Sequence, residues 1–160
     1  RLDEIPGVDK RAAQVIVAEI GVDMDRFPTD RHLASWAGMC PGNNESAGKR
    51  KSGRTTKGSP WLKATLVQTA HAAGRSKNTY LSALYRRLVL RKGNKRAAVA
   101  VGHAILVIAY HIIKSGNHYH DMGADYFDRL DRQAVARRLQ KRLEAIGFQV
   151  ELQDLETAAA

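Results

Sequence analysis

The sequence predicts an all-α protein: a compact helical domain with a helix-hairpin-helix-like element at its amino terminus and a long basic loop. Apolar residues recur at helical spacing through most of the chain, and probable cap residues stand before several of these runs. Only residues 148–152 are a candidate strand. A chain of 160 residues is expected to form one domain with a real core. We assign that domain to residues 1–150, followed by a tail at 151–160.

The first predicted element covers residues 1–21, where a tight turn at Pro6-Gly7 leads into a helix with Asp9 as its N-cap. Helix-hairpin-helix turns of this form present unpaired backbone amides to a phosphate. Asp9, however, stands where a second glycine is expected, and its carboxylate would repel a phosphate. Lys10 and Arg11 compensate only in part. Two alternatives therefore stay open, DNA contact by this element or a purely structural pair of helices.

A short helix is predicted from Thr29 to Gly38, and a longer one begins at Ser59-Pro60, which supply a cap and a preset first residue, and ends near Gly74. The window between them, Gly38 to Gly58, holds proline, glycines and asparagines without any helical period, which predicts a polar loop. Trp36 and Trp61 flank this loop. We expect them to anchor its two ends by packing rather than to stack on bases.

Three further helices complete the chain. Residues 79–92 carry an apolar stripe with arginines off it, and a basic helix is expected from about Asp131 to Ile146. Between them, residues 97–113 are apolar nearly all the way round. A membrane span is the alternative, but the interruptions at His103 and His111 favour a buried central helix. Both histidines are then interpreted as satisfied core residues.

The formal net charge of +10 favours a polyanionic partner, with nucleic acid first and an acidic membrane surface second. One group of basic residues falls in the predicted loop: Lys49, Arg50, Lys51, Arg54 and Lys57. Two further groups have helical spacing and are interpreted as solvated helix faces: Arg86, Arg87, Arg91, Lys92, Lys95 and Arg96, then Arg129, Arg132, Arg137, Arg138, Lys141 and Arg142. The loop group is therefore the stronger candidate for binding nucleic acid.

Cysteine and histidine usage argues against a metal centre in this chain. Cys40 is the sole cysteine, which excludes an internal disulfide and a multi-cysteine zinc site. Together with the lack of a recognisable secretory leader, it leads us to expect a cytoplasmic protein. His111, His118 and His120, with Asp121, have loose spacing that is more typical of packing or surface groups than of metal ligands.

Ser46 is the candidate nucleophile of the loop. The small residues Ala47-Gly48 follow it and would let a bulky electrophile approach, while the neighbouring cations could stabilise an alkoxide and a phosphoryl group under attack. No base except Glu45 is near it in sequence. Local chemistry alone therefore favours a phosphate-contacting or solvated serine. The other hydroxyls of the loop are interpreted as phosphate contacts at most: Ser52, Thr55 and Thr56.

Four motifs occur in order along this part of the chain: Gly-apolar-x-Pro at Gly38–Pro41, Ser-x-Gly at Ser46–Gly48, Gly-x-x-x-Lys-Gly at Gly53–Gly58, and Leu62-Lys63. With them, the sequence from about Leu2 to Phe127 resembles the carboxy-terminal transposase domain of the bridge-RNA-guided insertion-sequence serine recombinases.

The resemblance implies that Ser46 attacks a DNA phosphodiester and forms a covalent phosphoserine link before strand exchange. It also implies a Mg²⁺-binding RuvC-like amino-terminal domain outside these residues, a structured guide RNA, and a homo-oligomer. The chain alone is then expected to bind DNA but to cut it poorly. The departures are Ala47, where glycine is often seen, and Asp9. The alternative function is a non-catalytic helix-hairpin-helix module that binds nucleic acid.

Overall fold

The computed structural model describes residues 1–41 and 44–153, and the predicted all-α class is confirmed. In this part of the chain the regular structure is helical except for one small two-stranded hairpin. The contacts divide the chain into two compact units, residues 1–124 and a second unit that begins at Asp125.

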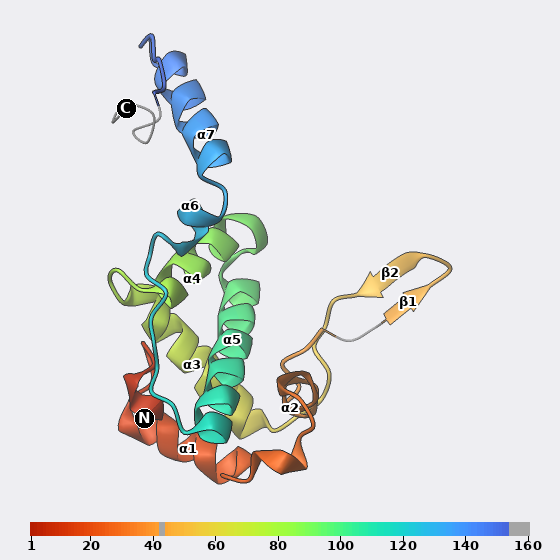
Figure 1. Ribbon diagram of the computed structural model, residues 1–160. Coiled ribbons are helices and arrows are strands. Elements are labelled where there is room, and N and C mark those ends of the chain that lie inside the picture. Colours follow the sequence, from red (N-terminus) through yellow and green to blue (C-terminus); the bar gives the residue numbers. More distant parts are fainter. Residues whose placement is uncertain (42–43, 154–160) are drawn as a thin grey trace. The chain divides into compact units, whose positions relative to one another are not determined.

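The first unit contains five α-helices, two short 3-10 helices and the hairpin (Figure 1). In chain order they are η1 (Leu2–Glu4), α1 (Lys10–Ile20), η2 (Met24–Arg26), α2 (Asp30–Trp36), β1 (Asn44–Ser46), β2 (Lys49–Ser52), α3 (Pro60–Arg75), α4 (Tyr80–Lys92) and α5 (Asn94–Ser115). Figure 1 shows α3, α4 and α5 packed together, with the hairpin projecting away from the helical body.

The predicted helix starts are confirmed by their caps. Each cap side chain accepts a hydrogen bond from a backbone amide in the first turn, which satisfies one of the donors that a helix leaves unpaired. Asp9 accepts from Ala12 N at 2.7 Å. The remaining caps are Thr29 for α2, Ser59 for α3 and Thr79 for α4. Pro60 occupies the first position of α3, as the sequence predicts.

The prediction of a central core helix is confirmed in α5, which packs against α2, α3 and α4. Its length and mean hydropathy of 1.7 would also suit a membrane span, but half of that apolar stretch is buried inside the protein. Gly102 makes the close packing possible, since a Cβ there would lie 2.9 Å from the carbonyl oxygen of Leu66 on α3. The buried face of α5 includes Val101, Ile105, Leu106 and Ala109.

The turn at Pro6-Gly7 packs against the backbone of α3. Gly7 has a φ of +87°, and a Cβ there would lie 2.4 Å from the carbonyl oxygen of Thr69 and 2.5 Å from the amide nitrogen of Ala73. Only glycine can adopt this conformation and fit this contact. The contact supports the structural alternative for this element. Lys10 and Arg11 are both exposed at the start of α1, so their DNA contact stays a prediction.

The segment after α5 is held against η1 and the start of α4. The carboxylate of Glu4 pairs with His118 Nδ1 at 2.7 Å and accepts from Tyr119 N at 3.0 Å. Asp121 accepts from Tyr80 N at 2.9 Å and from the Tyr119 hydroxyl at 2.8 Å. Burial, followed by this hydrogen bond, raises the pKa of Tyr119. His118 and Asp121 therefore have structural partners.

The second unit contains α6 (Tyr126–Leu130) and α7 (Arg132–Ala145). The basic helix predicted from about Asp131 is confirmed in α7, and Asp131 caps it by accepting from Ala134 N at 3.1 Å. Helix α6 falls in a stretch that the sequence pattern leaves irregular. The candidate strand at residues 148–152 is wrong, because that segment has no regular structure; Phe148 N instead donates to Leu143 O and closes the end of α7.

Candidate nucleic-acid interface

The loop from Gly38 to Gly58 is closed at its foot by a backbone crossing. A Cβ on Gly58 would lie 2.3 Å from the carbonyl carbon and oxygen of Ala37, so only glycine fits there. Gly38 has a φ of +67° directly after α2, the left-handed conformation that commonly ends a helix. The amide of Thr56 donates to Cys40 O at 3.2 Å across the foot.

Lys63, in the first turn of α3, holds the two chain segments of this foot together. Its Nζ donates to the hydroxyl of Thr55 and to the carbonyl oxygen of Gly38 at 3.5 Å. One half-buried side chain therefore links the two chain segments that carry the loop to a rigid helix. The Leu-Lys motif of the sequence thus has a structural role.

The loop contains a β-hairpin, so the prediction that this window holds no strand is wrong. Strands β1 and β2 are antiparallel, with Glu45 opposite Arg50 and Ser46 opposite Lys49. The turn is Ala47-Gly48, with φ values of 51° and 72°. Two positive φ values are typical of a type I′ turn, whose twist matches that of the strands. The strands are short and polar, and the apolar alternation that marks a strand is absent.

Ser46 is the last residue of β1 and is exposed. It lies directly across the hairpin from Lys49, which is exposed as well. Directly opposed residues place their side chains on one face, with Cβ atoms about 4.5–5.5 Å apart. The structure therefore places Ser46 and Lys49 opposite each other at the tip of the hairpin, with their side chains on one face.

The other predicted loop cations are not all brought to this tip. Arg54 and Lys57 are exposed after β2, toward the foot of the hairpin. Arg50 and Lys51 belong to β2, but their side chains lie outside the described residues, as does that of Ser52. The sequence therefore predicts five cations around Ser46, and the structure brings Lys49 next to it.

Two hydroxyls predicted as phosphate contacts instead take part in the foot of the loop. Thr55 accepts from Lys63, and Thr56 donates to Ser35 O at 3.5 Å. The expectation for the tryptophans holds only in part. Trp36 packs against Phe27 with ring centroids 5.5 Å apart, whereas Trp61 is 75% exposed and does not anchor the loop.

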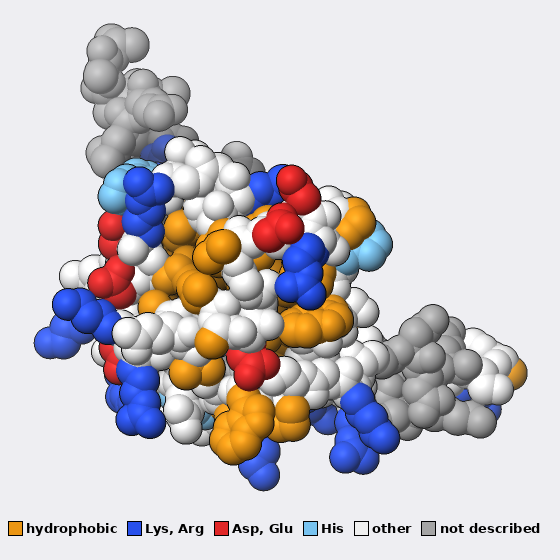
Figure 2. All heavy atoms as spheres, turned by 90° about the horizontal axis from the view of Figure 1, so that it is seen from below, with side chains coloured by type: hydrophobic (Ala, Val, Ile, Leu, Met, Phe, Trp, Pro, Cys, Tyr) orange, Lys and Arg blue, Asp and Glu red, His pale blue; other side chains and the backbone are white. Residues whose placement is uncertain are grey.

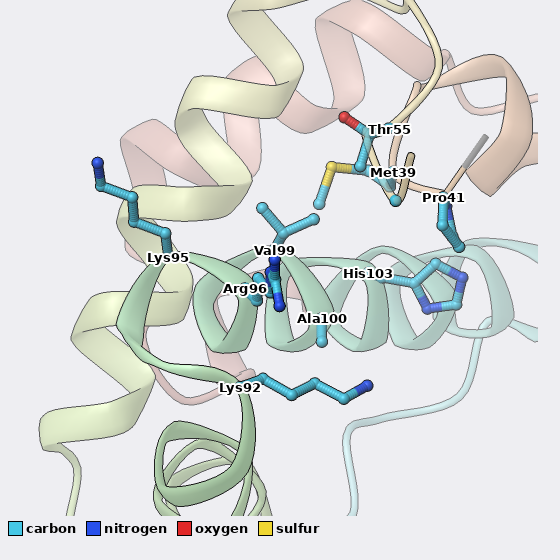
Figure 3. Close-up of a pocket in the computed structure, with 10 residues that line it drawn as sticks. Met39, Pro41, Thr55, Lys92, Lys95, Arg96, Val99, Ala100 and His103 are labelled. Atoms are coloured by element: carbon cyan, nitrogen blue, oxygen red, sulfur yellow. The ribbon is translucent and has the colours of Figure 1, made fainter. Parts of the chain in front are cut away.

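A groove of about 800 Å³ lies between the foot of the hairpin and the first turns of α5 (Figure 3). Its described lining comes from two walls. The hairpin side contributes Met39, Pro41, Gly53 and Thr55, and the helix side contributes Lys92, Lys95, Arg96, Val99, Ala100 and His103. In Figure 3, Val99 points toward Met39 and Thr55, and His103 lies toward Pro41.

The two histidines of α5 are not core residues, so that interpretation is wrong. His103 is half-buried and lines the groove, while His111 is exposed, with its ring edge-on to Tyr110. The continuous run of apolar residues does not reveal that these histidines lie outside the core, because other helices cover only one side of α5. A helical projection of Arg96, Val99 and His103 would have shown that they share a flank of α5. The second wall, roughly forty to sixty residues earlier in the chain, leaves no signal in the sequence.

The described residues hold no cluster of three or more His, Cys, Asp or Glu side chains that could bind a metal ion. His118 and Asp121, considered above as ligands, are instead hydrogen-bonded to Glu4 and Tyr119. Residues 1–41 and 44–153 therefore offer no site that fits the Mg²⁺ that the resemblance implies for the full-length enzyme.

Basic side chains are spread over the surface around this site. Figure 2 shows lysines and arginines around the periphery of one face, with hydrophobic side chains toward its middle. A helical unit with an exposed serine-lysine tip and a cationic groove has the charge pattern that favours a polyanionic partner.

Comparisons with known proteins identify the family to which this chain belongs. Residues 1–86 match the family described as Transposase IS116/IS110/IS902, and the chain belongs to that family. It is 33% identical over 126 residues to the protein named "Putative transposase y4pF/y4sB" of Sinorhizobium fredii (strain NBRC 101917 / NGR234), an alignment covering 74% of this chain. The aligned region spans 32% of that relative, about a third of its length. The predicted resemblance is thus confirmed at the level of the family.

Proposed function

We propose that this chain is the part of a DNA transposase that carries the nucleophile, Ser46, and that it recombines DNA through a covalent phosphoserine intermediate. Membership of the transposase family supports the class of reaction. The observation that carries the choice of residue is the position of Ser46, exposed at the tip of a projecting hairpin and opposite Lys49.

In the proposed step, the Ser46 Oγ attacks the phosphorus of a DNA phosphodiester. A bond forms between Oγ and phosphorus, and one ester bond from phosphorus to a deoxyribose oxygen breaks. The serine proton leaves to a base, and the departing sugar oxygen takes up a proton to become a free hydroxyl. Because one phosphate ester replaces another, a hydroxyl of a second DNA end can reverse the step and complete strand exchange.

Lys49 supports this chemistry electrostatically. Negative charge develops on the phosphoryl oxygens during attack, and a nearby ammonium group stabilises that charge. Its position opposite Ser46 supports a contact between this ammonium group and the phosphate that Ser46 attacks. Arg54 and Lys57, exposed nearer the foot, are proposed to hold the flanking DNA backbone, together with Arg50 and Lys51.

The described side chains do not hydrogen-bond the Ser46 hydroxyl, so the base that accepts its proton is proposed to come from another part of the working complex. We assign the Mg²⁺ carboxylates to that part as well, in a RuvC-like domain. A structured guide RNA, a homo-oligomeric state and a cytoplasmic location complete the proposal. Co-purification of RNA and light scattering over a range of concentrations test the first two.

The experiment is Ser46→Ala in the full-length protein, incubated with end-labelled substrate DNA and separated by denaturing electrophoresis. The expected result is normal DNA binding with complete loss of the protein–DNA adduct. Ser52→Ala is the matched control, because it removes another serine hydroxyl from the same hairpin, and it should form the adduct. An adduct that persists in Ser46→Ala would refute the assignment.

The alternative, a non-catalytic nucleic-acid-binding module, predicts a different outcome. Such a module needs the basic loop but no serine, so the Ser46→Ala protein would equal the unaltered protein in every assay. The packing of Gly7 against α3 also argues against a phosphate-binding turn at the amino terminus.

A further inference from the structure

The groove beside the hairpin has the dimensions and the walls of a binding site. Its volume of about 800 Å³ lies in the range of ligand-binding clefts. One wall is formed by the core helix α5 together with Lys92 at the end of α4, and the other by the foot of the loop, which Lys63 links to α3. The groove is therefore lined by ordered parts of the fold.

The groove is positively charged. Lys92, Lys95 and Arg96 all line it and are exposed, and no Asp or Glu occurs among its described lining residues. In the described part of the chain, none of these three cations forms an ion pair with a carboxylate. Three like charges close together repel one another, and a bound polyanion would remove that repulsion.

The inside of the groove is apolar. Val99 of α5 points toward the side chain of Met39, Pro41 and Ala100 add further apolar surface, and Thr55 adds a hydroxyl (Figure 3). A cationic rim over an apolar floor matches the chemistry of a nucleic-acid strand, whose charged phosphates alternate with apolar sugar faces. A small inorganic anion would use the rim and leave the floor empty.

We propose that this groove holds a segment of DNA backbone, with Lys92, Lys95 and Arg96 contacting successive phosphates. The choice of DNA over other polyanions rests on the proposed function. The groove adds a second contact to that function, beside the foot of the hairpin that carries Ser46. Lys92, Lys95 and Arg96 would then orient the strand, and the hairpin would reach a phosphodiester farther along it.

The first test compares two triple variants of the 160-residue chain that lose the same charge. The groove triple removes the three cations of the groove through Lys92→Ala, Lys95→Ala and Arg96→Ala. The α7 triple removes three exposed cations of α7 through Arg138→Ala, Lys141→Ala and Arg142→Ala. Binding of fluorescently labelled DNA is measured by anisotropy over a range of salt concentrations. Losing three phosphate contacts should reduce the log–log salt slope by about 2 to 3 for the groove triple.

The outcomes of this test are distinct. A clearly smaller change in the α7 triple supports the groove. An unchanged slope in the groove triple would show that its cations contact no phosphate, and equal losses in both triples would show only a net-charge effect. Either result would overturn the proposal. Duplex DNA, single-stranded DNA and an RNA of the same sequence are the probes, and a loss confined to RNA would overturn the assignment to DNA.

A second variant changes the shape of the groove and keeps its charge. Ala100→Trp places an indole on the floor of the groove, and DNA binding should weaken about tenfold, or about 1.4 kcal/mol. Circular dichroism and thermal melting establish that the variant is folded. If it is not, Lys95→Glu, at an exposed position, replaces it, with Lys141→Glu as its control. Unaltered binding in the folded variant would overturn the proposal.

The groove and the nucleophile can fail independently. Ser46→Ala should keep the salt slope of the unaltered chain, because it leaves the groove intact. If Ser46→Ala in the full-length protein still forms the adduct, the proposed function fails while the groove results stand. If the groove triple binds DNA normally and Ser46→Ala abolishes the adduct, the groove proposal fails while the proposed function stands.

Discussion

The hydroxyl of Tyr110 on α5 donates a hydrogen bond to the carbonyl oxygen of Phe27 at 3.1 Å. Tyr110 is 3% exposed, and its hydroxyl also accepts from Lys114 Nζ at 3.1 Å. Phe27 follows η2 and packs against Trp36 of α2. This one buried hydroxyl therefore connects the central helix to the segment that leads into the hairpin.

Tyr110→Phe should keep the fold and lower the free energy of unfolding. The change leaves the buried carbonyl of Phe27 without this donor, a loss that costs about 1–3 kcal/mol. Urea denaturation followed by circular dichroism measures it. Tyr85→Phe is the control, since Tyr85 bonds the side chain of His71 in a half-buried position, and its loss should be smaller. Equal stabilities of Tyr110→Phe and the unaltered chain would contradict the role of this bond.

Gly58→Ala should destabilise the foot of the hairpin. The added Cβ would lie 2.3 Å from the backbone of Ala37, so the two segments must move apart, and overpacking of this kind costs about 1–3 kcal/mol. Thermal unfolding and hydrogen exchange at the Thr56 amide report the change. Gly53→Ala is the matched control in the same loop, because a Cβ there meets nothing within 4 Å. Comparable losses in both variants would show that the crossing is unimportant.

Lys63→Met should loosen the loop while keeping the buried stem of the side chain. The variant loses the ammonium donor to Thr55 and Gly38. Hydrogen bonds that involve a charged group contribute about 1.5–3 kcal/mol to the free energy of unfolding. Faster hydrogen exchange at Thr56, whose amide bonds Cys40, is the expected signal. Lys57→Met alters an exposed lysine of the same loop and should leave that exchange rate unchanged.

Glu4→Gln should lower stability at neutral pH but not in acid. The hydrogen bond from His118, then that from Tyr119 N, lowers the pKa of Glu4 below its ordinary value of 4.5. A carboxyl group whose pKa is lower in the folded protein than in the unfolded chain stabilises the fold. This stabilisation is fully present above the unfolded-state pKa and is lost as the pH falls through the folded-state pKa. The melting temperatures of the two proteins should therefore differ at pH 7 and converge once the pH has fallen below the lowered pKa of Glu4. A difference that stays constant down to low pH would exclude this pair as its source.

The helices could be predicted from the sequence because their signals are local. An N-cap residue precedes α1, α3 and α4 in the sequence, namely Asp9, Ser59 and Thr79. Apolar residues at helical spacing follow each of these caps. The hairpin could not, because its strands are three and four residues long and carry polar residues on both faces. Their pairing depends on a foot closed by Gly38 and Gly58, a contact across twenty residues that no local pattern encodes.

The candidate site was predictable in part for the same reason. Ser46 and Lys49 are three residues apart, so the motif already implied that they are close, and the turn shows that they face each other. The groove combines α5 with residues near Met39 and Thr55, which only the folded chain brings together. Lys92, Lys95 and Arg96 therefore had the pattern of an ordinary solvated helix face.

Ala47→Gly should stabilise the hairpin. Ala47 has a φ of 51°, in the left-handed region where a side chain is disfavoured, and its replacement by glycine removes a strain of about 1 kcal/mol. Glycine also loses more freedom on folding, so the net gain should be a fraction of that strain. Ala47→Val, whose β-branched side chain is least compatible with this conformation, should open the turn.

Nuclear magnetic resonance provides the measurement for both variants. Contacts between the backbone protons of Ser46 and Lys49 report how much of the hairpin is formed, and they should strengthen in Ala47→Gly and weaken in Ala47→Val. If adduct formation by the full-length protein follows the same order, the hairpin itself positions the serine. If adduct formation is insensitive to both changes, DNA binding must impose the geometry of the turn.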